Sequence, residues 1–119
     1  MQNEMNTLRI EVSSLEDSAA QAIKAMETGA PQGRHLSFET PEMLVRMLGG
    51  HRLAVLNALL GGKAMGVREL ARRLGRDLRA VHNDMKKLVQ AGIVEKAEDG
   101  KLSCNYREIV CEFALRQAA

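Results

Sequence analysis

Apolar residues recur at helical spacing in the stretch that follows Gly66. Four of them lie at positions i, i+3, i+4 and i+7, on one face of a helix: Val67, Leu70, Ala71 and Leu74. This spacing predicts a helix over residues 67–74. Gly75 would end that helix, because glycine readily takes the left-handed conformation found just past a helix. The pattern therefore indicates a short amphipathic helix with a defined end.

A second helix is predicted over residues 78–90, directly after a tight turn. Asp77 precedes it and can accept a hydrogen bond from a free N–H of its first turn. The inward positions repeat with the same period: Leu78, Val81, Met85, Leu88 and Val89. Two helices joined by a turn that contains glycine form the helix-turn-helix pattern. Because helices this short are not stable alone, other segments must supply their core.

The flanking segments predict a supporting helix and a hairpin. Residues 51–60 are strongly apolar, with an inner stripe at Leu53, Leu56, Leu59 and Leu60. Gly92 closes the second helix, and an apolar strand starts at residue 93. The sequence Glu98-Asp99-Gly100 suits a turn that needs positive φ, with strands of about 93–97 and 101–106 on either side. A helix-turn-helix followed at once by a hairpin predicts a winged helix.

The first third of the chain predicts a strand and two helices. Leu8, Ile10 and Val12 alternate with polar residues, which predicts a strand over residues 7–12. A helix capped by Ser13 or Ser14 is expected next, running to about Glu27, and a linker follows over residues 29–34. A short strand is then expected over residues 35–39. The last of these segments is a helix over residues 41–48, with Thr40 as its cap and Met43 or Leu44 among its inward residues.

The C-terminal segment is open to two interpretations. Ile109, Cys111, Phe113 and Leu115 alternate, which favours a strand, while a helical spacing fits less well. We expect a strand that pairs with residues 8–12, within one subunit or between two. The resulting expectation is an α+β fold, mainly α: a winged helix-turn-helix domain over residues 35–119, with a C-terminal strand, after a strand–helix extension and linker over residues 1–34.

The composition of the chain indicates the kind of core and the cellular compartment to expect. Apolar residues make up 45% of the chain, but its only aromatic residues are Phe38, Tyr106 and Phe113, so the core should be aliphatic and rich in methionine. No apolar run is long enough to span a membrane, and the N-terminus lacks a signal-peptide pattern. Cys104 and Cys111 make neither a disulfide framework nor a zinc pattern, so we expect core cysteines, no metal or cofactor, and a reducing cytoplasm.

Positive charge is concentrated around the helix pair. Residues 1–50 carry four Lys or Arg and seven Asp or Glu, a net charge of −3. Residues 51–119 carry thirteen and eight, a net charge of +5, and residues 67–96 alone have a net charge of +4. A phosphate-binding surface requires such a concentration, although a solvated helix face shows it as well.

The outward face of the second helix carries the candidate base contacts. Arg79 and Asn83 lie at i and i+4, and their side chains are those that bond guanine and adenine through two hydrogen bonds. Neighbouring basic residues are placed for phosphates, which orient a protein without reading sequence. The candidate DNA-binding residues are Arg72, Arg73, Arg76, Arg79, Ala80, His82, Asn83, Lys86, Lys87, Lys96 and Lys101.

No catalytic constellation is expected. His82 and Asp84 are close in sequence, but no nucleophile or third orienting group accompanies them. Asp84 is expected to pair with a nearby arginine, such as Arg72 or Arg73, and so to hold the two helices together. The sequence therefore predicts a binding protein and not an enzyme.

The helix pair resembles a known group of DNA-binding domains. The stretch VRELARRLGRDLRAVHNDMKKLVQAGIVEK is similar to the winged helices of small bacterial and archaeal transcription regulators of the MarR and DeoR type, which share V-x-E-L-A-x-x-L-G, V-x-x-D-M-K-x-L and A-G-I-V. Gly66 stands where Ser or Thr is common in that group, but glycine is a tolerable cap. The resemblance implies a transcription regulator that binds double-stranded DNA.

A narrower resemblance covers the whole layout. Short DNA-binding proteins often encoded beside small toxin-like proteins have the same N-terminal strand and helix, a lead-in here from Phe38 to Leu44, and a closing segment here with Tyr106, Ile109, Phe113 and Leu115. This resemblance implies an antitoxin that represses its own operon.

Two functional hypotheses follow. The first is a sequence-specific regulator, a repressor acting as a homodimer on a palindromic operator, since one short helix reads few base pairs. The alternative is a protein-interaction module that binds and neutralises a partner, such as a toxin encoded nearby, through its acidic N-terminal third. In that case DNA binding is secondary or absent.

Overall fold

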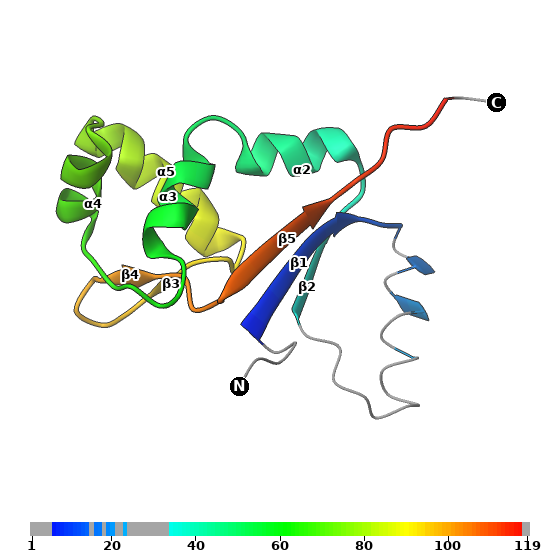
Figure 1. Ribbon diagram of the computed structural model, residues 1–119, viewed down its shortest axis with the longest axis horizontal. Coiled ribbons are helices and arrows are strands. Elements are labelled where there is room, and N and C mark those ends of the chain that lie inside the picture. The colour runs from blue at the N-terminus through cyan, green and yellow to red at the C-terminus, as the bar shows by residue number, and fades with distance from the viewer. Residues whose placement is uncertain (1–5, 15, 18, 21–22, 24–33, 118–119) are drawn as a thin grey trace. The chain divides into compact units, whose positions relative to one another are not determined.

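Four helices and five strands form among the residues that the structure describes (Figure 1). The computed structural model describes residues 6–14, 16–17, 19–20, 23 and 34–117. The helices are α2 (Pro41–Leu48), α3 (Arg52–Leu59), α4 (Val67–Leu74) and α5 (Leu78–Gln90), and the strands are β1 (Thr7–Val12), β2 (Arg34–Phe38), β3 (Glu95–Lys96), β4 (Leu102–Ser103) and β5 (Glu108–Glu112). An α+β fold is thereby confirmed.

The described residues group into two compact units. One consists of those up to Arg46 and those from Glu108 onward, and the other is residues 47–107. The predicted domain boundary between residues 34 and 35 is a statement about which parts of the chain fold independently. It stays a prediction. No helix in the described part of the chain is long and apolar enough to cross a membrane.

A three-stranded parallel sheet joins the two ends of the chain. β1 lies in the centre, between β2 and β5, with Ile10 opposite Leu36 on one side and Cys111 on the other. Leu8 and Ile10 are 2% and 0% exposed, as the alternating pattern predicted. The predicted pairing of the C-terminal strand with residues 8–12 is confirmed, and it occurs within one chain.

Polar side chains line the opposite face of this sheet. Thr7 Oγ1 donates to Glu108 Oε1 over 3.4 Å, and Arg9 Nη1 lies 3.4 Å from Glu112 Oε1. The Nδ1 atom of His35 lies 2.8 Å from Glu11 Oε1. Pairs that are partly exposed to water contribute little to stability. They define the polar side of the sheet, on which Thr7 is also buried, while Leu8 and Ile10 are buried on its apolar side.

The predicted cap residues are confirmed. Asp77 Oδ2 accepts a hydrogen bond from the Ala80 N–H over 3.1 Å, and Thr40 Oγ1 accepts one from the Met43 N–H over 3.2 Å. Ser14 Oγ accepts from the Asp17 N–H over 3.0 Å. Residues 16–17, 19–20 and 23 are helical, but the rest of the predicted helix to Glu27, and the linker over 29–33, lie outside the described residues.

The helices of the second unit pack around an aliphatic core, but the inner stripe predicted for α3 was partly wrong. Leu56 and Leu59 are 4% and 0% exposed, as expected. Leu53 is 52% exposed, and Val55, which the stripe omitted, is fully buried. The reason is that residues 52–60 are apolar on nearly every side, so their spacing does not define which side faces inward.

Two predicted inward residues around α5 and α2 are also exposed. Leu78 is 36% exposed because it is the first residue of α5, at the edge of the core. In α2, Leu44 is 2% exposed and Met43 is 44% exposed, so Leu44 is the inward residue of the two alternatives. Val81, Met85 and Leu88 are buried, as predicted for α5, and Val89 is half-buried.

A short hairpin follows α5, as predicted, but its strands are shorter than expected. Only Glu95–Lys96 and Leu102–Ser103 pair, antiparallel, around the predicted turn. Ile93 and Val94 are 1% and 2% exposed, and both N–H groups donate to the Leu88 carbonyl at the end of α5. These residues therefore belong to the helix end and the core, and not to the strand.

The connection between α3 and α4 runs along this hairpin. Gly61 and Gly62 donate backbone hydrogen bonds of 2.9 Å to the carbonyls of Tyr106 and Cys104. Met65 and Leu102 exchange two backbone hydrogen bonds, of 3.1 and 2.9 Å. Both glycines have φ near +85°, a conformation that side-chain-bearing residues rarely adopt. The hairpin is thereby fixed to the helices.

The two cysteines have different surroundings, and the prediction that both are core residues was half wrong. Cys104 is fully buried. Cys111 is exposed, because it lies on β5 at the edge of the sheet, where only one strand flanks it. Desolvation by burial raises the pKa of the Cys104 thiol and, through its buried part, that of Cys111.

The core of the second unit predicts the effect of two matched truncations. Leu59→Ala should lower the free energy of unfolding by about 2–5 kcal/mol, because it leaves a cavity at a buried position. Leu53→Ala on the same helix should change it by about 0.5 kcal/mol, as at other surface positions. Urea unfolding followed by circular dichroism measures both. Equal losses would contradict the assignment of the α3 inner face.

Thiol alkylation distinguishes the two cysteines. Iodoacetamide should modify Cys111 in the native protein and Cys104 only after denaturation, since reaction needs an accessible thiolate. Because the pKa of Cys111 is raised, its rate should keep rising above the pH near 8.5 at which a free cysteine is half ionised. Peptide mass spectrometry of native protein and of Cys111→Ser gives the result, and rapid native labelling of Cys104 would contradict it.

Candidate nucleic-acid interface

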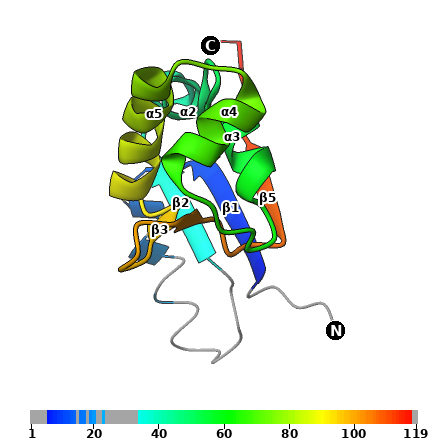
Figure 2. The same cartoon turned by 90° about the vertical axis from the view of Figure 1, so that its left-hand side faces the viewer.

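The helix pair positions the candidate residues. α4 ends at Gly75, whose φ of +63° matches the predicted left-handed cap, and α5 starts after Asp77. Figure 2 shows α5 running beside α3 and α4, with the hairpin strand β3 near its C-terminal end. Val81, Met85 and Leu88 bury one face of α5, at 0%, 3% and 0% exposure. The opposite face is therefore held toward solvent.

A stripe of polar side chains runs along that solvent face. Arg79, Asn83, Lys86 and Gln90 are all exposed and lie at i, i+4, i+7 and i+11, which places them in one row on a helix. This row contains Arg79 and Asn83, as the sequence predicted. Gln90 was missed, although its spacing from Asn83 could have identified it.

The other predicted residues of α5 flank this row. His82 is exposed on the side of the hairpin, and Lys87 is exposed on the other side. Ala80 is half-buried. The row and its flanks thus present three cationic side chains, an imidazole and two amides, and no carboxylate is among them.

Asp84 ties α5 to two other segments. Its Oδ1 accepts from Arg52 Nε over 3.1 Å, and its Oδ2 accepts from Arg76 Nη1 over 2.9 Å. Arg52 Nη1 also donates to the Met47 carbonyl over 3.0 Å. The three charged side chains are only 15–18% exposed, so the pairs are far less screened than surface pairs. Asp84 therefore fixes the rotation of α5 relative to α3 and the turn.

Asp84 pairs with a nearby arginine, as predicted, but the two arginines named as examples were wrong. Arg72 and Arg73 are exposed on α4, and Arg73 Nη2 lies 3.1 Å from Glu69 Oε2, one helical turn away. Arg76, which was assigned to phosphates, has its guanidinium in the Asp84 pair. Several arginines lie within reach in the sequence, and only the packing of α3 against α5 selects Arg52.

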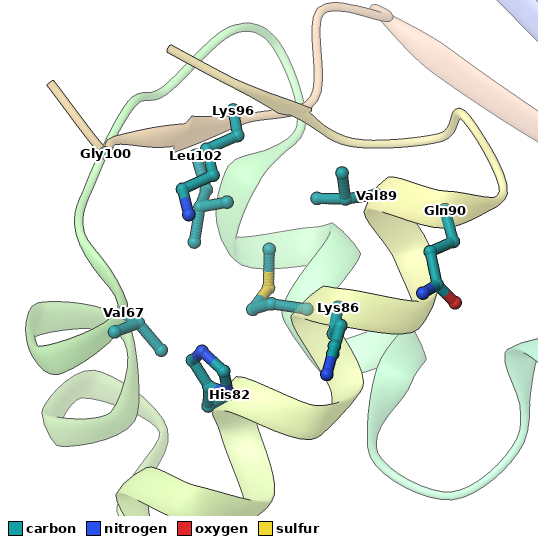
Figure 3. Close-up of a pocket in the computed structure, with 9 residues that line it drawn as sticks. Val67, His82, Lys86, Val89, Gln90, Lys96, Gly100 and Leu102 are labelled. Carbon is teal, nitrogen blue, oxygen red and sulfur yellow. The ribbon is translucent and has the colours of Figure 1, made fainter. Parts of the chain in front are cut away.

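Two hollows border α5. One, of about 680 Å³, lies beside the first turns of α4 and α5 and is lined by Arg68, Arg79 and His82 among others. Arg68 was not among the predicted DNA-binding residues. Its exposure at the start of α4 is what identifies it as a candidate. The second hollow, of about 380 Å³, lies between α5 and the hairpin (Figure 3).

The hairpin carries the remaining candidates. Lys96 and Lys101 are both exposed, and Lys96 lines the second hollow. Among the described residues, no group of three or more His, Cys, Asp or Glu is arranged to hold a metal ion. The exposed cationic residues of α4, α5 and the hairpin form the candidate interface. We call this set the basic face: Arg68, Arg72, Arg73, Arg79, His82, Asn83, Lys86, Lys87, Lys96 and Lys101.

Comparison with known proteins places this chain in a family. The model of the HVO_A0114 family matches residues 47–111, which is more than half of the chain and includes all of the basic face. The chain therefore belongs to the HVO_A0114 family. No curated protein matched it.

The Asp84 tie predicts a selective loss of stability. Asp84→Asn should lower the free energy of unfolding by roughly 2–4 kcal/mol, because it leaves two largely buried guanidinium groups without their carboxylate. Glu69→Gln breaks the exposed pair with Arg73 and should cost less than about 1 kcal/mol. Chemical denaturation of both variants provides the comparison. If Asp84→Asn lowers the free energy of unfolding no more than Glu69→Gln does, the ion pairs of Asp84 do not stabilise the fold.

Proposed function

We propose that this member of the HVO_A0114 family is a sequence-specific DNA-binding transcription regulator with a winged helix-turn-helix. The observation that carries the proposal is the exposed row Arg79–Asn83–Lys86 on a helix whose opposite face is buried. A helix held in this way can enter the major groove with its N-terminal half against the base edges.

The backbone arrangement around α5 supports the winged-helix interpretation. α3, α4 and α5 contact one another, and a tight turn at Gly75–Asp77 separates the last two. The segment before α4 pairs through Met65 with β4, so the hairpin is joined to a third stretch of extended chain. In a winged helix the hairpin forms the wing, which here carries Lys96 and Lys101.

Within the row, we assign base contacts to Arg79 and Asn83. Both are exposed on the first half of α5, one helical turn apart, so their side chains reach neighbouring base pairs. The guanidinium of Arg79 matches the two acceptors of guanine, and the amide of Asn83 matches adenine. The half-buried Ala80 offers a methyl group, the kind of group that contacts the methyl of thymine.

The rest of the basic face would bind phosphates. Lys86 belongs to the row, Arg68, Arg72 and Lys87 are exposed elsewhere on α4 and α5, and the two hairpin lysines extend the positive surface. Contacts to phosphates fix the position of the protein on the duplex without reading its sequence. We now assign Arg76 to the Asp84 tie, because its guanidinium is 2.9 Å from that carboxylate and its side chain is only 18% exposed.

The regulator would act as a homodimer and as a repressor in the cytoplasm. Two copies of α5 spaced about 34–36 Å apart would read two half-sites of a palindrome. β5 lies at an edge of the parallel sheet and offers a surface for a second copy, since edge strands carry unpaired backbone groups. A dimer bound over a promoter would block transcription by occupying it.

A second candidate function rests on exposed apolar side chains in the other unit. Met43, Val45, Phe113 and Leu115 are 44%, 49%, 46% and 80% exposed. Exposed apolar surface on a folded protein can mark a protein interaction site. An antitoxin would use this unit to bind a partner protein encoded nearby, and would bind its operator through the basic face. Co-purification of the product of the adjacent gene with this protein tests the second candidate function. Loss of that co-purification in a Phe113→Glu, Leu115→Glu double variant would support the function.

Base reading predicts the effect of two substitutions on DNA binding. Arg79→Ala and Asn83→Ala should each weaken binding to operator fragments by roughly 5- to 150-fold, because each lost contact is worth about 1–3 kcal/mol. Binding to random DNA should change less. Fluorescence anisotropy with genomic operator and random fragments, across a salt series, measures both.

Matched variants separate base contacts from phosphate contacts. Lys86→Ala should weaken binding to both kinds of DNA equally and lower the salt slope by about 1. Lys63→Ala and Asn105→Ala remove exposed residues of the same type outside the basic face and should bind as the parent does. If Arg79→Ala and Asn83→Ala also bind both kinds of DNA as the parent does, the proposed reading face is wrong.

A further inference from the structure

The hollow between α5 and the hairpin has an apolar floor. Val67, Met85, Val89 and Leu102 line it, and they come from α4, α5 and β4. Met85 and Leu102 are 3% and 5% exposed, so they form the bottom, while Val67 and Val89 are half-buried walls. A floor of this kind offers no hydrogen bond to a polar ligand but favours a hydrocarbon group.

Nitrogen-bearing side chains surround this floor. Lys86 and His82, from α5, and Lys96, from the hairpin, border the same hollow from two sides (Figure 3). No Asp or Glu is among the residues that line it. The two ammonium groups therefore leave the hollow with a positive charge that its own lining does not neutralise.

We propose that this hollow, defined as the wing groove, binds a small amphipathic carboxylate. Its apolar body would lie on Met85 and Leu102, and its carboxylate would lie between Lys86 and Lys96. The volume of about 380 Å³ falls in the range of about 300–1,000 Å³ that small-molecule sites occupy. An apolar lining with a few placed polar groups is also typical of such sites.

The floor distinguishes this ligand from a phosphate of the DNA backbone. A phosphodiester has several acceptor oxygens that need donors or water, and burying polar groups against apolar side chains without such partners is costly. The two lysines at the border could bind a phosphate at the entrance, but Val67, Met85, Val89 and Leu102 would remain uncovered. A hydrocarbon chain or ring covers them.

The position of the wing groove implies regulation, and this part rests on the proposed function. Lys86, Lys96 and His82 belong both to the groove and to the basic face. A bound carboxylate would neutralise charge that DNA needs and would occupy space between α5 and the wing. The ligand and the DNA should therefore exclude each other, and the ligand would release the regulator from its operator.

Octanoate is a suitable probe, used on the full chain below the concentrations at which it forms micelles. Titration calorimetry should show saturable binding of octanoate, and weaker or no binding of octanol and octylamine, which share its chain but lack the negative charge. Lys86→Gln and Lys96→Gln should each weaken octanoate binding by up to about 5-fold, the range for loss of an exposed ion pair. Val89→Gln should weaken it without removing a charge.

Two lysines serve as matched controls. Lys87 lies on α5 and Lys101 beside the hairpin turn, both exposed and neither lining the groove. Lys87→Gln and Lys101→Gln should therefore leave octanoate binding unchanged. Equal losses in these variants, equal binding of octylamine, or no octanoate binding in the millimolar range would overturn the proposal. If the lysine variants lose only DNA binding, and octanoate does not bind, the groove serves DNA alone.

A competition experiment tests the regulatory part separately. Octanoate should raise the apparent Kd for operator DNA in proportion to its occupancy, and this effect should be smaller with Lys96→Gln. Octanoate binding without any effect on DNA affinity would overturn the competition. Octanoate binding by a chain that binds no DNA would refute the proposed function and leave the ligand site supported.

Discussion

The burial of one face of α5 determines the rest of the second unit. Val81, Met85 and Leu88 lie in the core at 0–3% exposure, so the side chains opposite them must face water. A helix of 13 residues is marginal by itself, and its direction and rotation come from this packing. Asp84 adds a second constraint, because its two arginines belong to α3 and to the turn before α5. Together these contacts fix which side chains α5 presents.

Local signals predicted the elements well. Gly75 and Asp77 ended one helix and capped the next because both act through neighbouring backbone groups. The orientation of α3 could not be predicted, since its residues are apolar on nearly every side and only packing selects Val55 over Leu53. The partners of Asp84 were also beyond the sequence, because Arg52 lies 32 residues away and competes with nearer arginines. Arg79, Asn83 and Lys86 of the exposed row were predicted, but Gln90 was missed. The wing groove was not predicted, because its lining comes from α4, α5 and the hairpin.

The basic face and the wing groove share one wall of α5. Lys86 points to solvent in the row and also borders the groove, while Lys96 reaches the groove from the hairpin. When a surface binds DNA through only a few cationic side chains, a small anion that binds the same side chains lowers its affinity for DNA. In the proposed account the apolar floor selects that anion, and the lysines couple its binding to DNA binding.

The most direct test of the central claim is the affinity of the unmodified protein for DNA fragments from upstream of its own gene, measured beside random fragments of equal length at several salt concentrations. Reading by Arg79 and Asn83 predicts a preference of at least about a thousandfold for one upstream sequence, with affinity falling steeply as salt rises. Equal affinity for both kinds of fragment, or no binding at physiological salt, would contradict the account.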